Sequence, residues 1–302
     1  MQSMDWLSHL LKLIQISGRL DVRCVYGAPW RVVYDRSKEG EIPYHVVLRG
    51  TAFLEVTGVS SQRLTAGDVV LLPHGAAHML HDGSGEPPAE VRKRETMSLT
   101  ISENNGIGNR LDMLCGHFLL AASHDRLIRD YLPPRLIVRA GGAQLSNLTS
   151  LMRTEASLDS LGGHAMLDAL SAALFALTLR LSSESGEAPA GLLALASQSR
   201  LAPALTAMFR TPTYPWTLPE LAGLCNMSRA TFARHFQDKI GRSASDLLMD
   251  VRMTMAINEL KTSASVETVA EAVGYQSVAA FVRTFKQRNG MTPAAWRKSK
   301  LE

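Results

Sequence analysis

The sequence predicts an α+β multidomain protein, in which a β-rich barrel with flanking helices precedes an all-α domain containing a double helix-turn-helix. Three observations support this prediction. Short apolar runs punctuated by Gly and Pro occupy residues 20–138. Apolar residues at helical spacing follow from residue 141 onward. The last third of the chain contains an internal repeat.

Residues 30–34, 44–48, 52–56 and 68–72 are the clearest strand candidates. Each is a short apolar segment bounded by residues that favour turns. Several strands at this spacing are typical of a sandwich or a barrel. Residues 1–140 therefore form the first predicted domain.

The next segment, residues 141–181, changes to helical periodicity. Its apolar stripe includes Leu145, Leu148, Leu151, Met152, Met166, Leu167, Leu170, Leu174 and Leu177. This stripe either joins two subunits or packs on the chain's own barrel. Residues 182–191 are polar and small and include Pro189, which predicts a flexible linker before a second domain at 192–302.

Composition is that of a soluble globular protein, with 46% apolar and 20% charged residues. No run of about 18 uncharged apolar residues occurs, so we expect no membrane span. The N-terminus lacks the pattern of a signal peptide, which predicts a cytoplasmic protein. The three cysteines, Cys24, Cys115 and Cys225, are too few for a disulfide framework. In a reducing compartment they are buried filler, metal ligands or redox sensors, and core packing is expected for Cys225.

Positive charge is concentrated at the C-terminal end. Residues 215–302 contain 12 Lys+Arg and 8 Asp+Glu, a net +4, and the whole chain is also +4 (32 against 28). The remaining residues are therefore neutral overall, with 20 of each sign. This asymmetry indicates a polyanionic partner for the last segment.

The internal repeat relates residues 221–241 to residues 269–290. At an offset of 48, Leu221 and Ala222 match Val269 and Ala270; at an offset of 49, Ser228, Phe232, Arg234, Phe236 and Gly241 match Ser277, Phe281, Arg283, Phe285 and Gly290. The second copy has one additional residue, Gln276, in its turn.

Each copy has the layout of two helices joined by a tight turn. Asn226 and Gly274 suit a left-handed turn position. Ser228 and Ser277 then stand where a helix N-cap accepts backbone N–H bonds. The Phe residues four and eight positions later fix one face of the second helix against the first, which leaves the opposite face free.

That free face has the residue types that read DNA. A major groove admits one helix, and an Arg on it can hold guanine through two hydrogen bonds, worth about 1–3 kcal/mol of discrimination. A connecting helix at about residues 244–261 could place both second helices in successive grooves. The predicted DNA contacts are Ser228, Arg229, Ala230, Thr231, Arg234, Gln276, Ser277, Ala280 and Arg283. The first copy has more Arg, so we expect it to dominate base contacts.

This region closely resembles the AraC/XylS family of bacterial transcription regulators. The resemblance covers residues 217–297 and includes the first repeat copy, Arg252 and Ala256, and the second copy through Pro293. Ala244 departs from the Pro usual in the family. The resemblance implies sequence-specific binding to double-stranded promoter DNA and contact with RNA polymerase. A homodimer would fit paired DNA half-sites, and we expect no enzymatic activity.

The first domain resembles a cupin over residues 20–100. The resemblance rests on His45, Gly50, the turn Gly67-Asp68, and the segment Pro73-His74-Gly75-Ala76-Ala77-His78. In cupins, His residues from these two segments point into a small barrel and can ligate a metal. The usual His-x-His and the later Glu are not intact, which favours a sensor over a cupin enzyme fused to a DNA-binding domain.

Cupin-containing AraC regulators that respond to reactive chlorine resemble this chain at residues 24–27 and 114–118. They have Cys at the positions of Cys24 and Cys115, and His at those of His45 and His78. Two hypotheses follow: Cys24, His45 and His78 bind Zn²⁺ or copper, or Cys24 and Cys115 are oxidised. A small organic ligand in the barrel is an alternative signal, and a Cys on a strand can also be a small buried hydrophobe.

Overall fold

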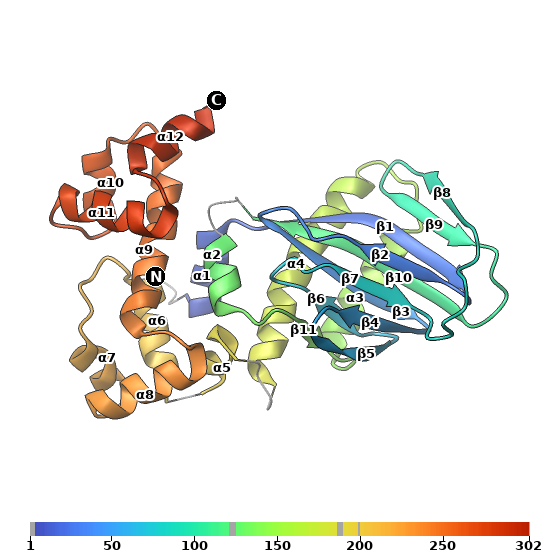
Figure 1. Cartoon of the computed structure of the whole chain (residues 1–302), viewed down its shortest axis with the longest axis horizontal. Coiled ribbons are helices and arrows are strands. Elements are labelled where there is room, and N and C mark those ends of the chain that lie inside the picture. Colours follow the sequence, from blue (N-terminus) through green and yellow to red (C-terminus); the bar gives the residue numbers. More distant parts are fainter. Residues whose placement is uncertain (1–3, 121–124, 186–189, 199, 302) are drawn as a thin grey trace. The chain divides into compact units, whose positions relative to one another are not determined.

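The computed structural model describes residues 4–120, 125–185, 190–198 and 200–301. The chain divides into two compact units (Figure 1). The barrel unit comprises residues 16–125 and 133–185, and the helical unit comprises residues 1–15, 126–132 and 186–302. The predicted α+β class, with β-structure first and an all-α domain last, is confirmed.

The barrel unit contains two sheets. The larger has the spatial order β11 (Leu136–Val138), β6 (Val69–Leu71), β3 (Glu41–Arg49), β10 (Arg110–Leu119), β1 (Ser17–Gly27), β9 (Thr100–Asn104), β8 (Val91–Glu95). The smaller has the order β2 (Arg31–Tyr34), β7 (His78–His81), β4 (Thr51–Val56), β5 (Val59–Thr65). The four strands predicted from apolar runs correspond to β2, β3, β4 and β6.

Side chains from both sheets fill the interior of this unit. Trp30, Leu54 and Leu80 from the smaller sheet's side meet Met113 and Tyr26 from the larger sheet. All five are buried. The interior is therefore a packed core, as expected for a small barrel.

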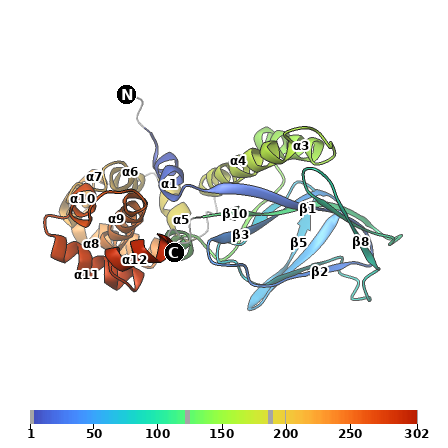
Figure 2. The same ribbon diagram turned by 90° about the horizontal axis from the view of Figure 1, so that it is seen from above.

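Helices α3 (Ala143–Glu155) and α4 (Gly163–Glu184) run along one side of the larger sheet (Figure 2). The ring of Phe175 on α4 lies 4.9 Å from that of Phe118 on β10. The Tyr44 and Ser171 hydroxyls are 2.7 Å apart. Of the described helices, α4 alone is long and apolar enough to cross a membrane, but these contacts bury its apolar face against the barrel.

The helical unit consists of ten helices among the residues described. They are α1 (Trp6–Ile14), α2 (Asp125–Tyr131), α5 (Leu192–Ser197), α6 (Ala202–Arg210), α7 (Leu218–Leu224), α8 (Arg229–Ile240), α9 (Ala244–Leu260), α10 (Val266–Ala272), α11 (Val278–Asn289) and α12 (Pro293–Leu301). The connecting helix predicted at about 244–261 is α9.

The domain boundaries differ from those predicted. Helices α1 and α2 group with the helical unit, although both lie within the predicted domain 1–140. Helix α4 extends to Glu184, so residues 182–184 are helical rather than linker. Ser182 is buried on the packed face of α4, and tertiary burial outweighs the low helix propensity of Ser. Residues 186–189 of the predicted linker lie outside the described part of the chain.

Candidate nucleic-acid interface and sensor site

Both helix-turn-helix copies form as the sequence predicts. Asn226 and Gly274 have φ angles of +52° and +84°, in the left-handed region. The Ser228 hydroxyl accepts a hydrogen bond from the Thr231 backbone N–H at 3.2 Å, and Ser277 accepts one from that of Ala280 at 3.4 Å. These bonds satisfy N–H groups that have no partner within the first turns of α8 and α11.

The four predicted Phe residues are buried, and the opposite faces of α8 and α11 are open to solvent. Exposed positions on or beside these faces are Ser228, Arg229, Ala230, Arg234, Gln276, Ser277 and Arg283. Thr231 and Ala280 are half-buried. The Thr231 hydroxyl also accepts a hydrogen bond from Ser228 at 2.9 Å, which makes it less available to a ligand.

Arg252 on α9 supports the fold and does not belong to the exposed faces of α8 and α11. Its guanidinium donates to the carbonyl oxygens of Pro212 at 2.6 Å and Tyr214 at 2.9 Å. A Cβ at Gly274 would lie 2.5 Å from the carbonyl oxygen of Thr213, so only Gly fits there. The segment before the first motif is thereby fixed against the second.

In the barrel, the two cysteines predicted as a redox pair are brought together. Cys24 on β1 is paired with Met113, and Cys115 on β10 with Val22, so the two are diagonal neighbours. Their Sγ atoms are 3.9 Å apart and both residues are buried. A disulfide requires about 2.05 Å between the sulfurs. The structure therefore shows two adjacent free thiols.

His45 and His78 join this pair. His45 lies directly opposite Cys115 across β3 and β10, and its Nδ1 is 3.2 Å from the Cys115 Sγ. The His45 Nε2 is 2.8 Å from the Nε2 of His78, and the His78 Nδ1 is 2.9 Å from the carbonyl oxygen of Ala76. The Tyr34 hydroxyl donates to Cys115 at 3.3 Å.

The hydrogen bonds run in series from Cys115 through His45 and His78 to the carbonyl oxygen of Ala76, and this last acceptor sets their direction. The Ala76 carbonyl can only accept, so a neutral His78 has its proton on Nδ1 and a lone pair on Nε2. The His45 Nε2 must then donate, which leaves its Nδ1 as an acceptor for the thiol proton of Cys115. Proton positions are thus inferred from the network.

Burial and hydrogen bonding both shift the pKa values of the groups in this site. Complete burial lowers the pKa of His45 well below its usual value, and burial also lowers the pKa of His78. Burial raises the pKa of the Cys115 thiol. When the Cys115 thiol donates to the Cys24 sulfur instead of to His45, that hydrogen bond lowers the pKa of Cys24 despite the burial of the Cys24 thiol. Cys24 is therefore the thiol of the pair that ionises more readily.

A cavity of about 500 Å³ reaches this site from the smaller sheet. Tyr34 and His78 line it, together with Glu55, Val56 and Met79. The Tyr34 ring stacks on His78 at 4.7 Å between centroids. Tyr34 and His78 therefore stand between this cavity and the buried thiols, which do not line it.

Tyr34 was missed by the sequence analysis, although it contacts both Cys115 and His78. It ends a predicted strand, and β2 pairs with β7 so that Tyr34 faces His78. Only that register gives Tyr34 its role, since nothing in the local sequence distinguishes it from a core aromatic.

Of the predicted metal ligands Cys24, His45 and His78, only the two histidines are in contact. Among the described residues, no three His, Cys, Asp or Glu side chains converge on a possible metal position. The sulfur in contact with His45 is that of Cys115, whereas Cys24 was predicted. Tetrahedral coordination at about 2.05 Å would separate two ligating nitrogens by about 3.3 Å. The observed 2.8 Å is a hydrogen bond, so the imidazoles as placed do not fit a shared metal.

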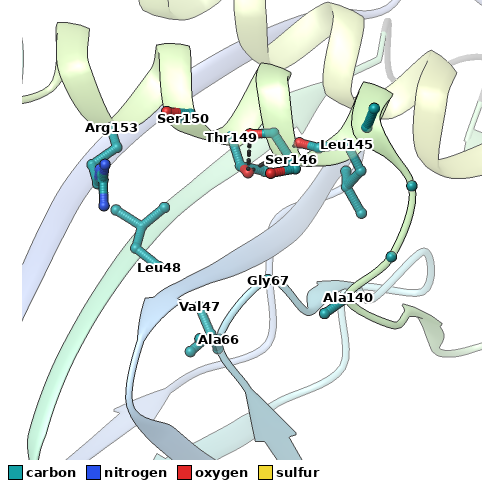
Figure 3. A pocket seen from close by; sticks show the side chains of 13 residues that line it. Val47, Leu48, Ala66, Gly67, Ala140, Leu145, Ser146, Thr149, Ser150 and Arg153 are labelled. Atoms are coloured by element: carbon teal, nitrogen blue, oxygen red, sulfur yellow. Dashed lines mark hydrogen bonds between the residues drawn. The ribbon is translucent and has the colours of Figure 1, made fainter.

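A second cavity, of about 560 Å³, lies between β3 and the start of α3 (Figure 3). Val47, Leu48, Ala140 and Leu145 contribute much of its wall, and the Thr149 hydroxyl already bonds the Leu145 carbonyl at 3.0 Å. Its polar lining comes from one element, α3, which contributes Ser146, Thr149, Ser150 and Arg153.

Comparison with known proteins agrees with both halves of the molecule. A family described as Cupin matches residues 5–184, and a helix-turn-helix domain family matches residues 221–299. An uncharacterized HTH-type transcriptional regulator of Haemophilus influenzae is 31% identical over 98% of this chain and 99% of its own length.

Two further relatives are similar over nearly their full lengths. The HTH-type transcriptional regulator MtrA of Neisseria gonorrhoeae is 29% identical over 98% of both chains. The RCS-specific HTH-type transcriptional activator RclR of Escherichia coli is 28% identical over 97% of both chains.

The fold, the paired recognition helices and these matches define a DNA-binding transcription regulator with an N-terminal cupin domain. The chain belongs to the AraC/XylS family of regulators.

Proposed function

We propose that this regulator binds specific promoter DNA under the control of a reversible disulfide between Cys24 and Cys115. The observation that supports the proposal is the 3.9 Å contact between two buried thiols, one of them hydrogen-bonded to an imidazole. Reactive chlorine is the proposed oxidant class, in keeping with the similarity to the RCS-specific activator.

The oxidation proceeds in two balanced steps. The sulfur of Cys24, whose thiol ionises more readily, attacks the chlorine of hypochlorous acid and becomes a sulfenyl chloride, with hydroxide leaving as water. The sulfur of Cys115 then attacks the Cys24 sulfur and displaces chloride. Overall, two thiols and one hypochlorous acid give one disulfide, one water and hydrogen chloride, and the thiols lose two electrons.

The imidazole pair removes the proton that the second step releases. The His45 Nδ1 takes the proton of Cys115 while the His45 Nε2 passes its own proton to His78. Positive charge thus moves from a completely buried ring to the ring that lines the cavity, where solvent can remove it. This transfer uses the contacts from Cys115 to His45 and from His45 to His78.

Thiol counting and peptide mass spectrometry of the full-length protein test the proposal. One equivalent of hypochlorous acid should convert Cys24 and Cys115 into one disulfide, with Cys225 still reduced. DNA affinity should change at the same time, measured with duplexes that the wild-type protein selects from a random-sequence library. Cys24→Ser should bind these duplexes and lose the response.

Cys225→Ser is the matched control, because Cys225 is a buried thiol of the helical unit. Its response to oxidant should equal that of the wild type. A Cys24→Ser protein that still responds fully to hypochlorous acid would exclude Cys24 from the mechanism.

Zn²⁺ or a copper ion is the second candidate signal. Thiol and imidazole are donors that both metals accept. Opening the His45–His78 contact by about 0.5 Å would give two nitrogens the spacing of a tetrahedral site. The same purified protein, analysed for metal before and after oxidation, decides between the candidates. One tightly bound equivalent, lost on substitution of His45 or His78, would favour the metal.

A small organic ligand is the alternative signal. Core side chains fill much of the barrel interior, and a cavity of about 500 Å³ lies beside Tyr34. An organic effector would bind there, so Val33→Trp would block it and leave disulfide formation intact. A second alternative, a cupin enzyme, has no assigned acid, since Glu55 pairs with His81 at 3.2 Å.

We also propose that the protein is cytoplasmic, acts as a homodimer and contacts RNA polymerase, as expected for its family. No membrane attachment is proposed.

A further inference from the structure

Helix α2 belongs to the helical unit although the chain on both sides of it belongs to the barrel unit. The Tyr131 hydroxyl on α2 donates to Asp250 on α9 at 2.6 Å. Asp250 is buried, and its other oxygen lies 3.1 Å from Arg288. A helix from the barrel half of the sequence thus donates a hydrogen bond to a buried carboxylate of the DNA-binding half.

The same helix contacts the ends of both recognition helices. Arg242, which follows the C-terminal end of α8, pairs with Asp130 at 2.8 Å and lies over the Tyr131 ring. Arg126 donates to the backbone carbonyl of Arg288 near the end of α11. Arg288 in turn pairs with Asp246 on α9 at 2.5 Å.

We propose that α2 is a positioning element for DNA recognition, which holds α8 and α11 in one relative placement through Arg126, Asp130 and Tyr131. Two recognition helices on one chain read DNA together only if their spacing matches successive grooves. Ionic contacts to both helix ends fix that spacing. Without them, each motif has only its contacts with α9 and the neighbouring helices.

The redox site is covalently continuous with this element, and this part of the inference depends on the proposed function. Cys115 lies on β10, which leads to α2, and Cys24 lies on β1, which α1 precedes. Ser17 pairs with Leu119, so both connections leave the sheet at the same end.

Closing the cysteine pair is expected to move these strands. Diagonal neighbours in an antiparallel pair are normally about 7–8 Å apart at Cα, whereas a disulfide usually spans roughly 4.4–6.8 Å. The sulfurs must approach by about 1.9 Å from their present 3.9 Å. The resulting displacement of β1 and β10 is passed along the chain to α1 and α2, and so to the placement of α8 and α11.

The test uses the full-length Arg126→Ala/Tyr131→Phe protein, with Asp130→Asn as a milder variant if the double variant folds poorly. The probes are DNA duplexes selected from a random-sequence library. Each is used as selected and with one base pair inserted between the two segments that α8 and α11 protect from cleavage. The wild type should lose at least about tenfold in affinity on insertion. The variants should lose less than about threefold, because their motifs move independently.

Redox coupling gives the second readout. The wild-type affinities of the reduced and disulfide forms should differ at least about fivefold, the lower end of ordinary allosteric coupling. In the α2 variants the disulfide should form equally well and the ratio should fall below about twofold. Tyr214→Phe is the matched control: it also removes a Tyr–carboxylate hydrogen bond in the helical unit, to Glu220, and should behave as the wild type.

Variants that form the disulfide and keep both the wild-type insertion penalty and the wild-type ratio would overturn the inference. If the wild type forms no disulfide, the proposed redox function fails by itself. The insertion experiment then still decides whether α2 positions the recognition helices.

Discussion

Single residues decide the chemistry at the centre of the barrel. One backbone acceptor, the carbonyl of Ala76, fixes the tautomer of His78, then of His45, and through them the protonated state of Cys115. Removing one polar partner from a buried network leaves the others without hydrogen bonds, which costs about 1–3 kcal/mol. The chain of contacts therefore stabilises the fold as well as preparing the thiol.

The first prediction concerns base recognition by Arg234 on α8 and Arg283 on α11. Replacing either by Ala should weaken binding to a selected duplex by about 1–3 kcal/mol, the value of a two-pronged contact with guanine. Binding to random DNA should weaken less, since it depends on the phosphates. Gel-shift titrations on both duplexes measure the difference, and we expect a larger effect for Arg234. Equal losses on both DNAs would argue against base readout.

The second prediction concerns pH and His117 on β10. Its Nδ1 lies 2.6 Å from an oxygen of Asp21, and this hydrogen bond raises the pKa of His117. A raised pKa means that the pair stabilises the fold fully below the unfolded pKa of about 6.5, and that this stabilisation is lost as pH rises through the folded pKa.

His117→Gln should therefore lower the melting temperature more at pH 5.5 than at pH 9. Asp21→Asn should give the same pattern, because it removes the other half of the pair. A loss of stability that is independent of pH in both variants would contradict the assignment.

At the scale of elements, the N-caps define where the recognition helices begin. Ser228 and Ser277 each accept a hydrogen bond from one backbone N–H at the helix end that is predicted to enter DNA. Their capping bonds keep the first turn of each helix ordered, so that residues in that turn are presented in a fixed direction.

The third prediction is that Ser228→Ala lowers the free energy of unfolding by about 0.5–2 kcal/mol. Chemical denaturation monitored by circular dichroism measures this loss. Ser245→Ala is the control, because Ser245 is exposed within α9 and is not a capping residue. An equal effect of both substitutions would mean that the cap contributes nothing.

At the scale of the whole molecule, the barrel uses the apolar stripe of α4 for its own core. The sequence left open whether residues 141–181 join two subunits or pack on the barrel. The two helices of this segment differ in this respect. Leu167, Leu174 and Phe175 are buried against the barrel. Leu151 and Leu158, on α3 and just after it, are about half exposed, at 49% and 48%.

The fourth prediction assigns the proposed homodimer contact to that exposed face. Leu151→Glu/Leu158→Glu should shift the protein toward a monomer in sedimentation equilibrium, since burying a carboxylate at an interface is unfavourable. Ile107→Glu changes an equally apolar exposed residue elsewhere and should leave the mass unchanged. A double variant with wild-type self-association would place the dimer contact elsewhere.

The sequence by itself determined the paired recognition helices, because local signals specify them. The left-handed turn at Asn226, the cap at Ser228 and the buried Phe spacing all act within one or two helical turns. The strand carrying His45 was also predicted, from a short apolar run, whereas the strands carrying Cys24 and Cys115 were not among the predicted runs.

Only the tertiary structure decided which side chains meet. The register of β1, β10 and β3 places Cys115 against both Cys24 and His45, and a one-residue slip would reverse the faces. The pairing of β2 with β7 added Tyr34. Helix α2 joined the helical unit because its polar side chains find partners on α9 and beside it, from Arg242 to Arg288, more than a hundred residues away along the chain. Contacts at that separation depend on how elements pack, which no local pattern records.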